Sequence, residues 1–318
     1  MAIIPLSSEH VPAAADLVVV GVERLARRVP VLPGAWTDPD VVARVLAALV
    51  ERGTGLAAID DGTLVAFQAA TVLDGHGGRW AYTPDLGHAA PGDVSGRLRE
   101  RLYAGLADGW VGGACTEHVI TILADDEDAA VTLGRLGFGQ IVVDLVRDLA
   151  PVCAPDLPDG VMVRRALSRD AGAMVGLDAG LRRHLQATPV FLRLGIAATQ
   201  EVQRRRIEDS AGAIFLAERD GEAVGFLRIG PSASDVATIV RDAGTASITG
   251  AFTVPSLRGG GVATALLAAA VDWAREAGFV RCAVDHESAN REAGRFWSRH
   301  FVPVTVSLGR RLPPAAGT

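Results

Sequence analysis

The sequence predicts an α/β fold with a mixed α+β sheet, present twice in tandem. Three observations support this prediction: a length of 318 residues, a proline-rich segment near the middle, and the same order of features on either side of it. A chain of this length forms two domains of about 150 residues more often than one. Each half is expected to run through a strand, helices, antiparallel strands, a helix, another strand, a helix and a closing strand.

The proline-rich segment, residues 151–160, is the predicted linker. Its three prolines and one glycine disfavour a helix and make a poor central strand. The predicted organisation is therefore a first domain at residues 1–150, this linker, a second domain at 161–312, and a short tail at 313–318.

The two halves share features at a nearly constant spacing, which indicates an internal duplication. Each half has an Asp-Gly dipeptide, which is typical of a hairpin turn between two strands. Each half then has a tryptophan, a phenylalanine and a closing strand in the same order. The matched features are Asp61–Gly62 with Asp220–Gly221, Trp110 with Trp273, Phe138 with Phe301, and Gln140–Leu149 with Pro303–Leu312.

The composition is that of an ordinary globular protein. Hydrophobic residues make up 49% of the chain and charged residues 21%, and the net charge of -6 gives no reason to bind nucleic acid. The three cysteines lack the CxxC spacing of a zinc site, so neither a disulfide framework nor a metal is indicated. The first residues lack the apolar run of a signal peptide. We expect a cytoplasmic monomer or homodimer that does not bind membranes.

A glycine-rich turn in the second half is the strongest functional signal. Residues 258–263 read Arg-Gly-Gly-Gly-Val-Ala and lie between an expected strand, Ser247–Val254, and an expected helix, Val262–Ala277. Glycines at such a turn let backbone N–H groups converge, and the helix N-terminus adds positive potential. The turn therefore predicts a site for a pyrophosphate group.

Two familiar phosphate-binding motifs do not fit this turn. The glycines at 259–261 are consecutive, and no carboxylate follows at the position that binds ribose, which excludes the dinucleotide fingerprint GxGxxG. A P-loop needs a lysine after its glycines, whereas all 31 basic residues of this chain are arginine.

The turn resembles motif A of the GCN5-related N-acetyltransferase superfamily, written Q/R-x-x-G-x-G/A. Arg258, Gly261 and Ala263 match its three fixed positions. A second match follows at the family's motif B, N-x-x-A-x-x-F-Y, and at the aromatic residue after it. The residues of this second match are Asn290, Ala293, Phe296 and Phe301. Two motifs in the family's order make the resemblance specific, and it covers residues 161–312.

The resemblance implies an acyltransferase fold in each half and acetyl-CoA as the acyl donor, with no metal. It places the side chain of Asn290 on the pantetheine arm, and it places the thioester carbonyl against a backbone N–H near Val254, where the fourth strand splays. The cofactor-binding residues that it implies are Thr253, Val254, Arg258, Gly259, Gly260, Gly261, Val262, Ala263, Thr264, Asn290 and Trp297.

The residues for proton transfer depart from the family's pattern. Ser247 stands where the family often has a glutamate, and Trp297 stands where it commonly has a tyrosine. Nearby replacements follow an expected strand at residues 280–284. An imidazole titrates near neutral pH, so His286 is the candidate base, with Asp285 or Glu287 to orient it. The alternative is that these three polar residues cap a helix that starts near Ser288.

The first half lacks the glycine turn at the matching position. Ser95 falls where Arg258 would, and Leu98 where Gly261 would, while Glu100 adds negative charge nearby. Leucine does not supply the exposed backbone that glycine does. We therefore expect the first half to be a scaffold without a cofactor site.

The leading interpretation is an N-acetyltransferase that acts on a primary amine of a small molecule. The amine is expected to enter beside the first helices of the second half, around Leu181 to Arg206. Polar candidates on that side are His184, Gln186, Arg193 and Glu201. One alternative is a non-catalytic acyl-CoA-binding protein, suggested by Ser247 and Trp297. Another, within the family, is an enzyme like mycothiol synthase, which is also a tandem acetyltransferase of about this size.

Overall fold

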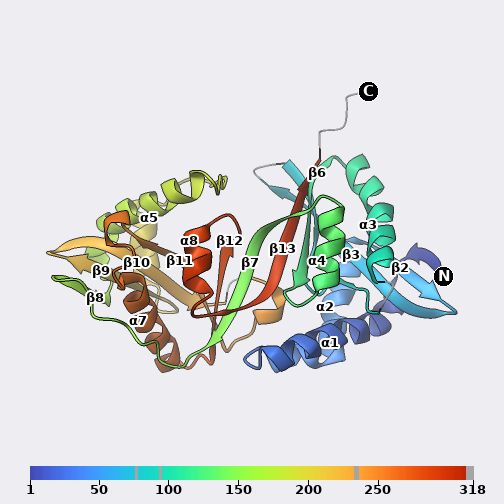
Figure 1. Ribbon diagram of the computed structural model, residues 1–318, viewed down its shortest axis with the longest axis horizontal. Helices are drawn as coiled ribbons and strands as arrows, with labels where there is room; N and C mark the ends of the chain where they lie inside the picture. Colours follow the sequence, from blue (N-terminus) through green and yellow to red (C-terminus); the bar gives the residue numbers. More distant parts are fainter. Residues whose placement is uncertain (76–77, 93–94, 233–235, 313–318) are drawn as a thin grey trace. The chain divides into compact units, whose positions relative to one another are not determined.

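The computed structural model describes residues 1–75, 78–92, 95–232 and 236–312, which form two compact units (Figure 1). Unit 1 contains Met1–Asp144, Ala237–Ile239 and the chain from Val302 on, whereas unit 2 contains Leu145–Val236 and Val240–Phe301. Each unit combines helices with a mixed sheet, which confirms the predicted fold class. The predicted tail at 313–318 lies outside the described residues.

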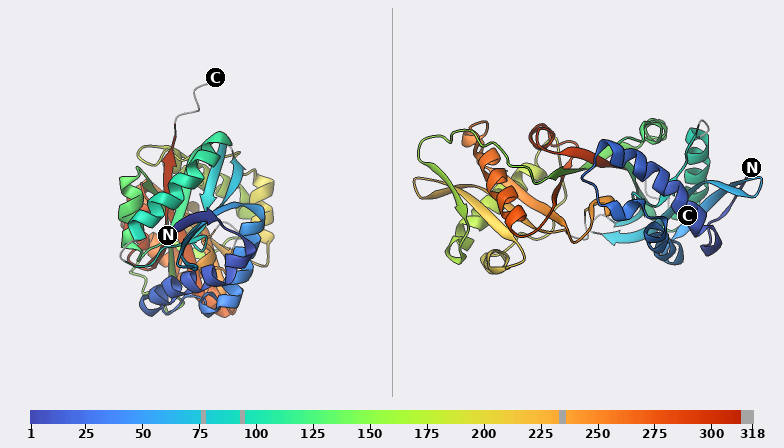
Figure 2. Two further views of the ribbon diagram at one scale, coloured as in Figure 1. Left: turned by 90° about the vertical axis from the view of Figure 1, so that its right-hand side faces the viewer. Right: turned by 90° about the horizontal axis from the view of Figure 1, so that it is seen from below.

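The sheet of unit 1 has the strand order β1-β2-β3-β4-β6-β13, with β5 paired to β3. Helix α1 packs against α2 and α3 packs against α4, and the two pairs lie on opposite sides of the strands (Figures 1 and 2). The bounds are β1 Ala2–Pro5, α1 Val11–Arg28, α2 Pro39–Arg52, β2 Thr54–Asp60, β3 Thr63–Gly75, β4 Gly78–Thr83, β5 His88–Ala89, α3 Ser95–Gly112, β6 Cys115–Leu123, α4 Glu127–Arg135, β7 Gly139–Asp148 and β13 Val302–Arg311.

The closing strand β13 does not stay with the second half of the chain. It pairs antiparallel with β6, from Thr305 opposite Leu123 to Arg311 opposite Glu117, and both strands belong to unit 1 (Figure 1). Leu308 of β13 joins the core formed by β6, α3 and α4. The predicted second domain, 161–312, therefore differs from the compact unit at this strand. Alternating apolar residues fix which face of a strand is buried, but not which sheet edge it joins.

The two predicted hairpin turns are confirmed. Asp61–Gly62 joins β2 to β3 with φ values of 47° and 78°, and Asp220–Gly221 joins β9 to β10 with φ values of 52° and 84°. Positive φ at both central residues is the requirement of the two-residue turn that matches the twist of antiparallel strands. The Asp-Gly dipeptides therefore set these hairpins locally.

The sheet of unit 2 has the strand order β12-β11-β10-β9-β8, with α5 above it and α7 below it in Figure 1. On the α5 face, Phe226 of β10 packs with Met174 and Leu177 of α5. On the other face, α7 buries Leu266 and Val271. The bounds are β8 Val161–Arg165, α5 Ala171–Gln186, α6 Gln200–Glu208, β9 Ala213–Arg219, β10 Glu222–Pro231, β11 Thr245–Thr253, α7 Val262–Glu276, β12 Arg281–Glu287 and α8 Arg291–Trp297.

Unit 2 differs from the predicted elements mainly at β12. That strand continues through Glu287. Asp285, His286 and Glu287, which the sequence predicts to follow the strand, therefore lie within it. The helix expected from Ser288 begins at Arg291, where the side chain of Asn290 caps it. Strand β11 and helix α7 lie within two residues of their predicted bounds, because the glycine turn separates them sharply.

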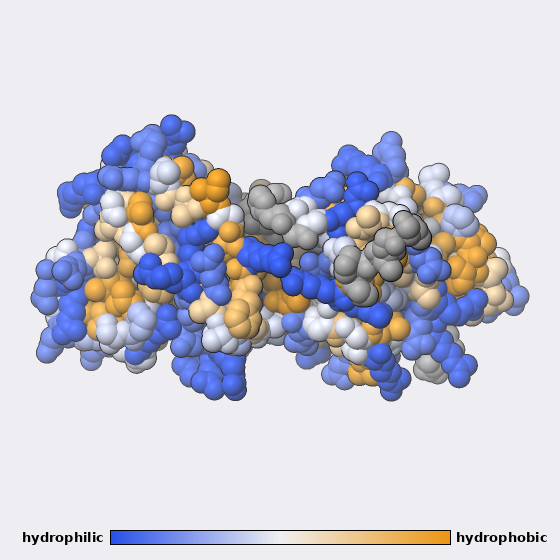
Figure 3. Space-filling model, turned by 90° about the horizontal axis from the view of Figure 1, so that it is seen from above, coloured by the Kyte–Doolittle hydropathy of each residue, from blue (hydrophilic) through white to orange (hydrophobic). Residues whose placement is uncertain are grey.

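No helix in the described parts of the chain is long and apolar enough to span a bilayer. On the face drawn in Figure 3, apolar side chains are interspersed among hydrophilic ones.

Burial holds one histidine of unit 1 in its neutral form. His118 of β6 lies beneath the aromatic rings of Tyr103 and Trp110, and its Nδ1 shares a hydrogen bond of 3.0 Å with the Tyr103 hydroxyl. Burial, with a smaller contribution from Arg310, lowers the pKa of His118 from 6.5 to about 4. Between these two pH values the unfolded chain therefore binds a proton that the folded chain does not.

We predict that stability falls as the pH drops from 6.5 toward 4, because protonation then favours the unfolded chain. This single group contributes at most about 1.4 kcal/mol per pH unit. The measurement is urea unfolding of wild type and His118→Gln over this pH range. The variant should be less stable at pH 7 and should lose less stability on acidification. An equal loss in both proteins would contradict the assignment.

Candidate active site

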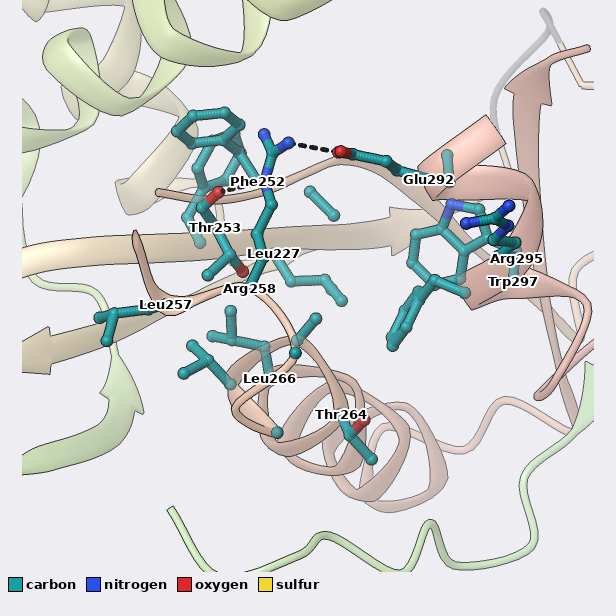
Figure 4. A pocket seen from close by; sticks show the side chains of 18 of the residues that line it. Leu227, Phe252, Thr253, Leu257, Arg258, Thr264, Leu266, Glu292, Arg295 and Trp297 are labelled. Atoms are coloured by element: carbon teal, nitrogen blue, oxygen red, sulfur yellow. Dashed lines mark hydrogen bonds and ion pairs between the residues drawn. The ribbon is translucent and has the colours of Figure 1, made fainter. Parts of the chain in front are cut away.

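A cavity of about 580 Å³ lies in unit 2 (Figure 4). Its walls come from α5, β10, β11, the glycine turn, the first turns of α7, and α8. Most of the residues that the sequence assigned to the cofactor line it. These are Thr253, Arg258, Gly259, Gly261, Val262, Ala263, Thr264, Asn290 and Trp297. Val254 and Gly260 do not line it, although both lie in the same turn region.

The cavity opens where two neighbouring strands separate. Strand β11 pairs in parallel with β12 only from Thr245 to Ile248. On its other side β11 stays paired with β10, but the pairing contains a bulge. Arg228 of β10 lies opposite Gly250, and the next residue, Ile229, lies opposite Ile248. The extra residue is Thr249. A bulge bends its strand, so β11 turns away from β12 at the residue after their last pair.

The bulge leaves backbone donors of β11 facing the opening. The N–H of Val254 donates to the carbonyl of Val224 in β10 at 2.9 Å. Because antiparallel strands alternate, the N–H groups of Thr253 and Ala251 must point away from β10, toward the side that β12 has left. The carbonyl of Thr253 points the same way and accepts a hydrogen bond from Arg258 Nε at 3.1 Å. The N–H of Val254, near which the sequence predicts the donor to the thioester carbonyl, is therefore already hydrogen-bonded to β10. The N–H groups of Ala251 and Thr253 lie instead on the edge of β11 that faces the cavity.

The glycine turn has the geometry of an anion cradle. Gly259 and Gly261 adopt φ values of 79° and 83°, a region that other residues rarely enter, and Gly261 is the N-cap of α7. Apart from the two adjoining residues, no atom of the described residues lies within 4 Å of where a Cβ on Gly259 would be. The first N–H groups of a helix have no partner inside the helix, so those of α7 are available to a ligand.

The predicted linker lies against this cradle. A Cβ on Gly261 would come within 2.5 Å of Pro155, and one on Gly260 within 3.1 Å of Pro158. Pro155 also lines the cavity. The sequence predicts a plain connection at 151–160, whereas in the folded chain Pro155 and Pro158 pack against the glycine turn. Their sequence spacing gives no signal of this contact.

A charged network crosses the cavity mouth. Arg258, at the end of the turn, forms an ion pair with Glu292 of α8, and its guanidinium lies 5.7 Å from the centre of the Phe252 ring (Figure 4). On the opposite wall His184 of α5 approaches the same carboxylate. Its Nε2 lies 3.3 Å from Asn290 Oδ1 and 4.0 Å from Glu292 Oε2. Glu292 is the one carboxylate among the described residues that line the cavity.

Two of these groups had only weak sequence signals. His184 is one of several polar candidates on the expected acceptor side, and Glu292 lies two residues after the motif-B asparagine. Asn290, which the resemblance places on the cofactor, has two roles in the structure. Its side chain lines the cavity, and its Oδ1 also caps α8 by accepting from the N–H of Ala293 at 3.2 Å.

The structure does not bring the predicted base into the cavity. The ring of His286 packs against Gly294 of α8, and its Nδ1 is 3.0 Å from the carbonyl oxygen of Glu287. Asp285 is exposed, and none of His286, Asp285 and Glu287 is among the described residues lining the cavity. The reason is the length of β12: strand alternation turns the His286 side chain toward α8.

The positions that depart from the family are also explained by the fold. Ser247 is fully buried and lies opposite Ala283 in the paired part of β11, before the strands separate. Trp297 lines the cavity, and its ring meets those of Phe296 and Phe301 edge to face, at 4.8 and 5.5 Å between centroids. The indole therefore forms an apolar end wall and brings no hydroxyl.

The matching region of unit 1 is filled by ionic contacts. A cavity of only about 150 Å³ remains there. Arg99 of α3 lies within it, paired with Asp126 at 2.5 Å and 2.9 Å from His88 Nδ1. Burial, helped by the Arg99 charge, lowers the pKa of His88 to about 4, so this ring accepts from the guanidinium. Leu98, at the sequence position that matches Gly261, lies inside α3 and packs in the core.

We predict that Gly259→Asp abolishes binding of acetyl-CoA, the ligand implied by the resemblance, without unfolding the protein. Aspartate and asparagine enter the left-handed region more readily than most residues, and the space around Gly259 is open. The aspartate charge would oppose a pyrophosphate at the helix N-terminus. Gly259→Asn is the matched neutral control and should lose less affinity. Calorimetric titration measures both, and equal affinities for the two variants would contradict an anion cradle.

Comparisons with known proteins agree with this geometry. Residues 182–301 match the sequence model of the acetyltransferase (GNAT) family. A search of curated proteins found no match. A GCN5-related N-acetyltransferase from Sphaerobacter thermophilus superimposes with a TM-score of 0.59 at 17% identity, over 100% of this chain and 97% of that one.

Two further solved structures share the fold. A tandem GNAT protein from the clavulanic acid pathway has a TM-score of 0.53 at 14% identity, with 99% of both chains covered. A fungal glucosamine N-acetyltransferase region has a TM-score of 0.54 at 14% identity, over 97% of this chain and 38% of that one. Residues 182–301 therefore match the GNAT acetyltransferase family, within a chain that shares the fold of a tandem GNAT protein.

Proposed function

We propose that unit 2 transfers an acetyl group from acetyl-CoA to a primary amine of a small molecule. One observation carries the proposal: the free N–H groups of Ala251 and Thr253 and the glycine cradle at Gly259 and Gly261 lie in one cavity. The cradle suits a pyrophosphate, and the strand edge suits an extended arm that needs backbone hydrogen bonds. An acyl-CoA carries both groups in one molecule, because its extended pantetheine arm is joined directly to the pyrophosphate.

Different residues along the cavity bind different parts of the acyl-CoA. The turn and the first N–H groups of α7 hold the phosphates, with Arg258 beside them. Asn290 and the edge of β11 hold the arm. Acetyl-CoA supplies the activated acyl group as a thioester. The N–H groups of Ala251 and Thr253 are donors fixed by the sheet, so they can stabilise negative charge on a carbonyl oxygen without reorganising.

His184 and Glu292 are the groups for the acceptor amine. An amine must be neutral to attack a carbonyl, so an ammonium acceptor has to lose a proton first. The imidazole of His184 is placed in the cavity to accept that proton. Glu292 lies beside it and can attract the ammonium once phosphate draws Arg258 away. Nothing in the cavity favours the mycothiol synthase-like version over other amines, so the proposal stays at the level of a primary amine.

A second candidate function is acyl-CoA binding without turnover. Two observations favour it: Ser247 is buried away from the cavity, and Trp297 replaces a hydroxyl by an indole. Such a protein would keep the cradle and the strand edge but lack proton transfer. Because His184 does lie in the cavity, the enzyme is the stronger proposal.

The proposal predicts one acetyl-CoA per chain and release of free thiol. Calorimetric titration should give a single site, since Arg99 and Asp126 fill the matching region of unit 1. A panel of small amines, with thiol release followed over time, should reveal at least one acceptor. Tight binding with no thiol release from any amine would favour the non-catalytic candidate. Two sites per chain would show that unit 1 also binds the cofactor.

We further predict that His184→Gln lowers turnover by about 100-fold. Glutamine can still donate a hydrogen bond to Asn290 Oδ1, so acetyl-CoA affinity should change little. The acidic limb of the pH–rate profile should disappear, because glutamine does not titrate. His286→Gln is the matched control: the same change, made outside the cavity, should leave the limb in place. Loss of the limb in His286→Gln alone would restore the base that the sequence suggested.

A further inference from the structure

The bulge that opens the cavity is held by a single side chain. Arg228 of β10 donates from Nε to the hydroxyl Oγ1 of Thr249 at 2.8 Å, and from Nη2 to the carbonyl of Thr249 at 2.8 Å. Thr249 is the extra residue of the bulge. Both hydrogen bonds therefore fix the one residue of β11 that has no partner in the ladder. Two bonds from a planar guanidinium fix orientation as well as position.

The neighbouring residue leaves room for this contact. A Cβ on Gly250 would lie 3.0 Å from Arg228 Nη2 and 3.4 Å from the ring of Phe226. Contacts below 3.4 Å force the neighbour to shift, so a larger residue at 250 would displace the guanidinium. The φ of Gly250 is not positive, so its backbone conformation does not require glycine. Its missing side chain lets Arg228 reach the bulge.

Arg228 is also placed at an energetic cost. Among the described residues its Nη1 has no hydrogen-bond partner and almost no solvent contact. Burial, with the nearby charge of Arg206, lowers the pKa of Arg228, while Asp178 opposes that shift. A guanidinium in such surroundings loses hydration, and here its hydrogen bonds to Thr249 and the charge of Asp178 offset that loss.

We propose that Arg228 is a positioning residue that locks the Thr249 bulge and thereby aims the N–H groups of Ala251 and Thr253 into the cavity. This inference rests on the function proposed above. The side-chain and N–H directions of a strand alternate with a period of two, so one inserted residue reverses the phase of everything after it. Without the bulge, the N–H groups of residues 250 and 252 would face the cavity, and those of 251 and 253 would face β10.

The test compares Arg228→Met with wild type by two measurements. Hydrogen–deuterium exchange of the protein without ligand reports on β11 whether or not the protein is an enzyme. We expect faster exchange at residues 249–253 in the variant. Turnover with acetyl-CoA and an amine should fall at least about tenfold, because a small misplacement of fixed donors is costly. Acetyl-CoA affinity should fall by less than turnover does, since the phosphates are held at α7 and only the contact between the arm and β11 is weakened.

Three further variants separate the bulge from charge and from general stability. Gly250→Ala keeps Arg228 but crowds it, and should change exchange and turnover in the same direction as Arg228→Met but by less. Thr249→Val removes one acceptor and keeps the carbonyl, so its effects should be intermediate. Arg206→Met removes a neighbouring positive charge without touching the bulge, and its exchange at β11 should equal that of wild type.

Several results would overturn the inference. Unchanged exchange at 249–253 in both Arg228→Met and Gly250→Ala would show that the bulge stands without Arg228. Faster exchange with wild-type turnover would show that the locked bulge does not serve the reaction. If wild type itself turns over no amine, the proposed function fails instead, and the exchange of the variants still decides whether Arg228 locks the bulge.

Discussion

The site depends on one constraint in the middle of a sheet: β11 must stay paired with β10 while it leaves β12. The inserted Thr249 satisfies this constraint, because a bulge bends a strand and shifts its phase without breaking the ladder on the other side. The parting strands create the cavity, and the shifted phase supplies its backbone donors. The strand then continues into the glycine turn at the N-terminus of α7. The donors and the cradle are therefore parts of one continuous segment.

Charge is arranged differently at the matching places of the two units. In unit 2 the cavity of about 580 Å³ is bordered by Arg258, Arg295 and Arg299 with Glu292 as a single carboxylate among the described lining residues. In unit 1 the small cavity is lined by Arg99, which is paired with Asp126. A guanidinium that is already paired and buried has few hydrogen-bond donors left for a phosphate. The cavity region of unit 1 thus contains an internal ion pair, whereas that of unit 2 is open.

The linker shows how a segment without regular structure can contribute to a site. Pro155 and Pro158 lie against the glycine turn, and the ring of proline fixes its φ. Their rings limit the space over Gly260 and Gly261 but leave Gly259 open. The wall of the cradle is thus rigid on the linker side and accessible at one glycine.

The sequence by itself determined the features that are set locally. The Asp-Gly hairpins, the glycine turn before α7 and the order of strands and helices follow from short-range conformational preferences and periodicity. Nine cavity-lining residues, from Thr253 to Trp297, were named from two motifs for the same reason. Tertiary structure alone decided the rest: which sheet edge accepts β13, which histidine faces the cavity, and where β11 leaves β12. These depend on contacts between residues far apart in the chain, such as His184 with Asn290 and Arg228 with Thr249, and neither residue of such a pair carries a local signal of the other.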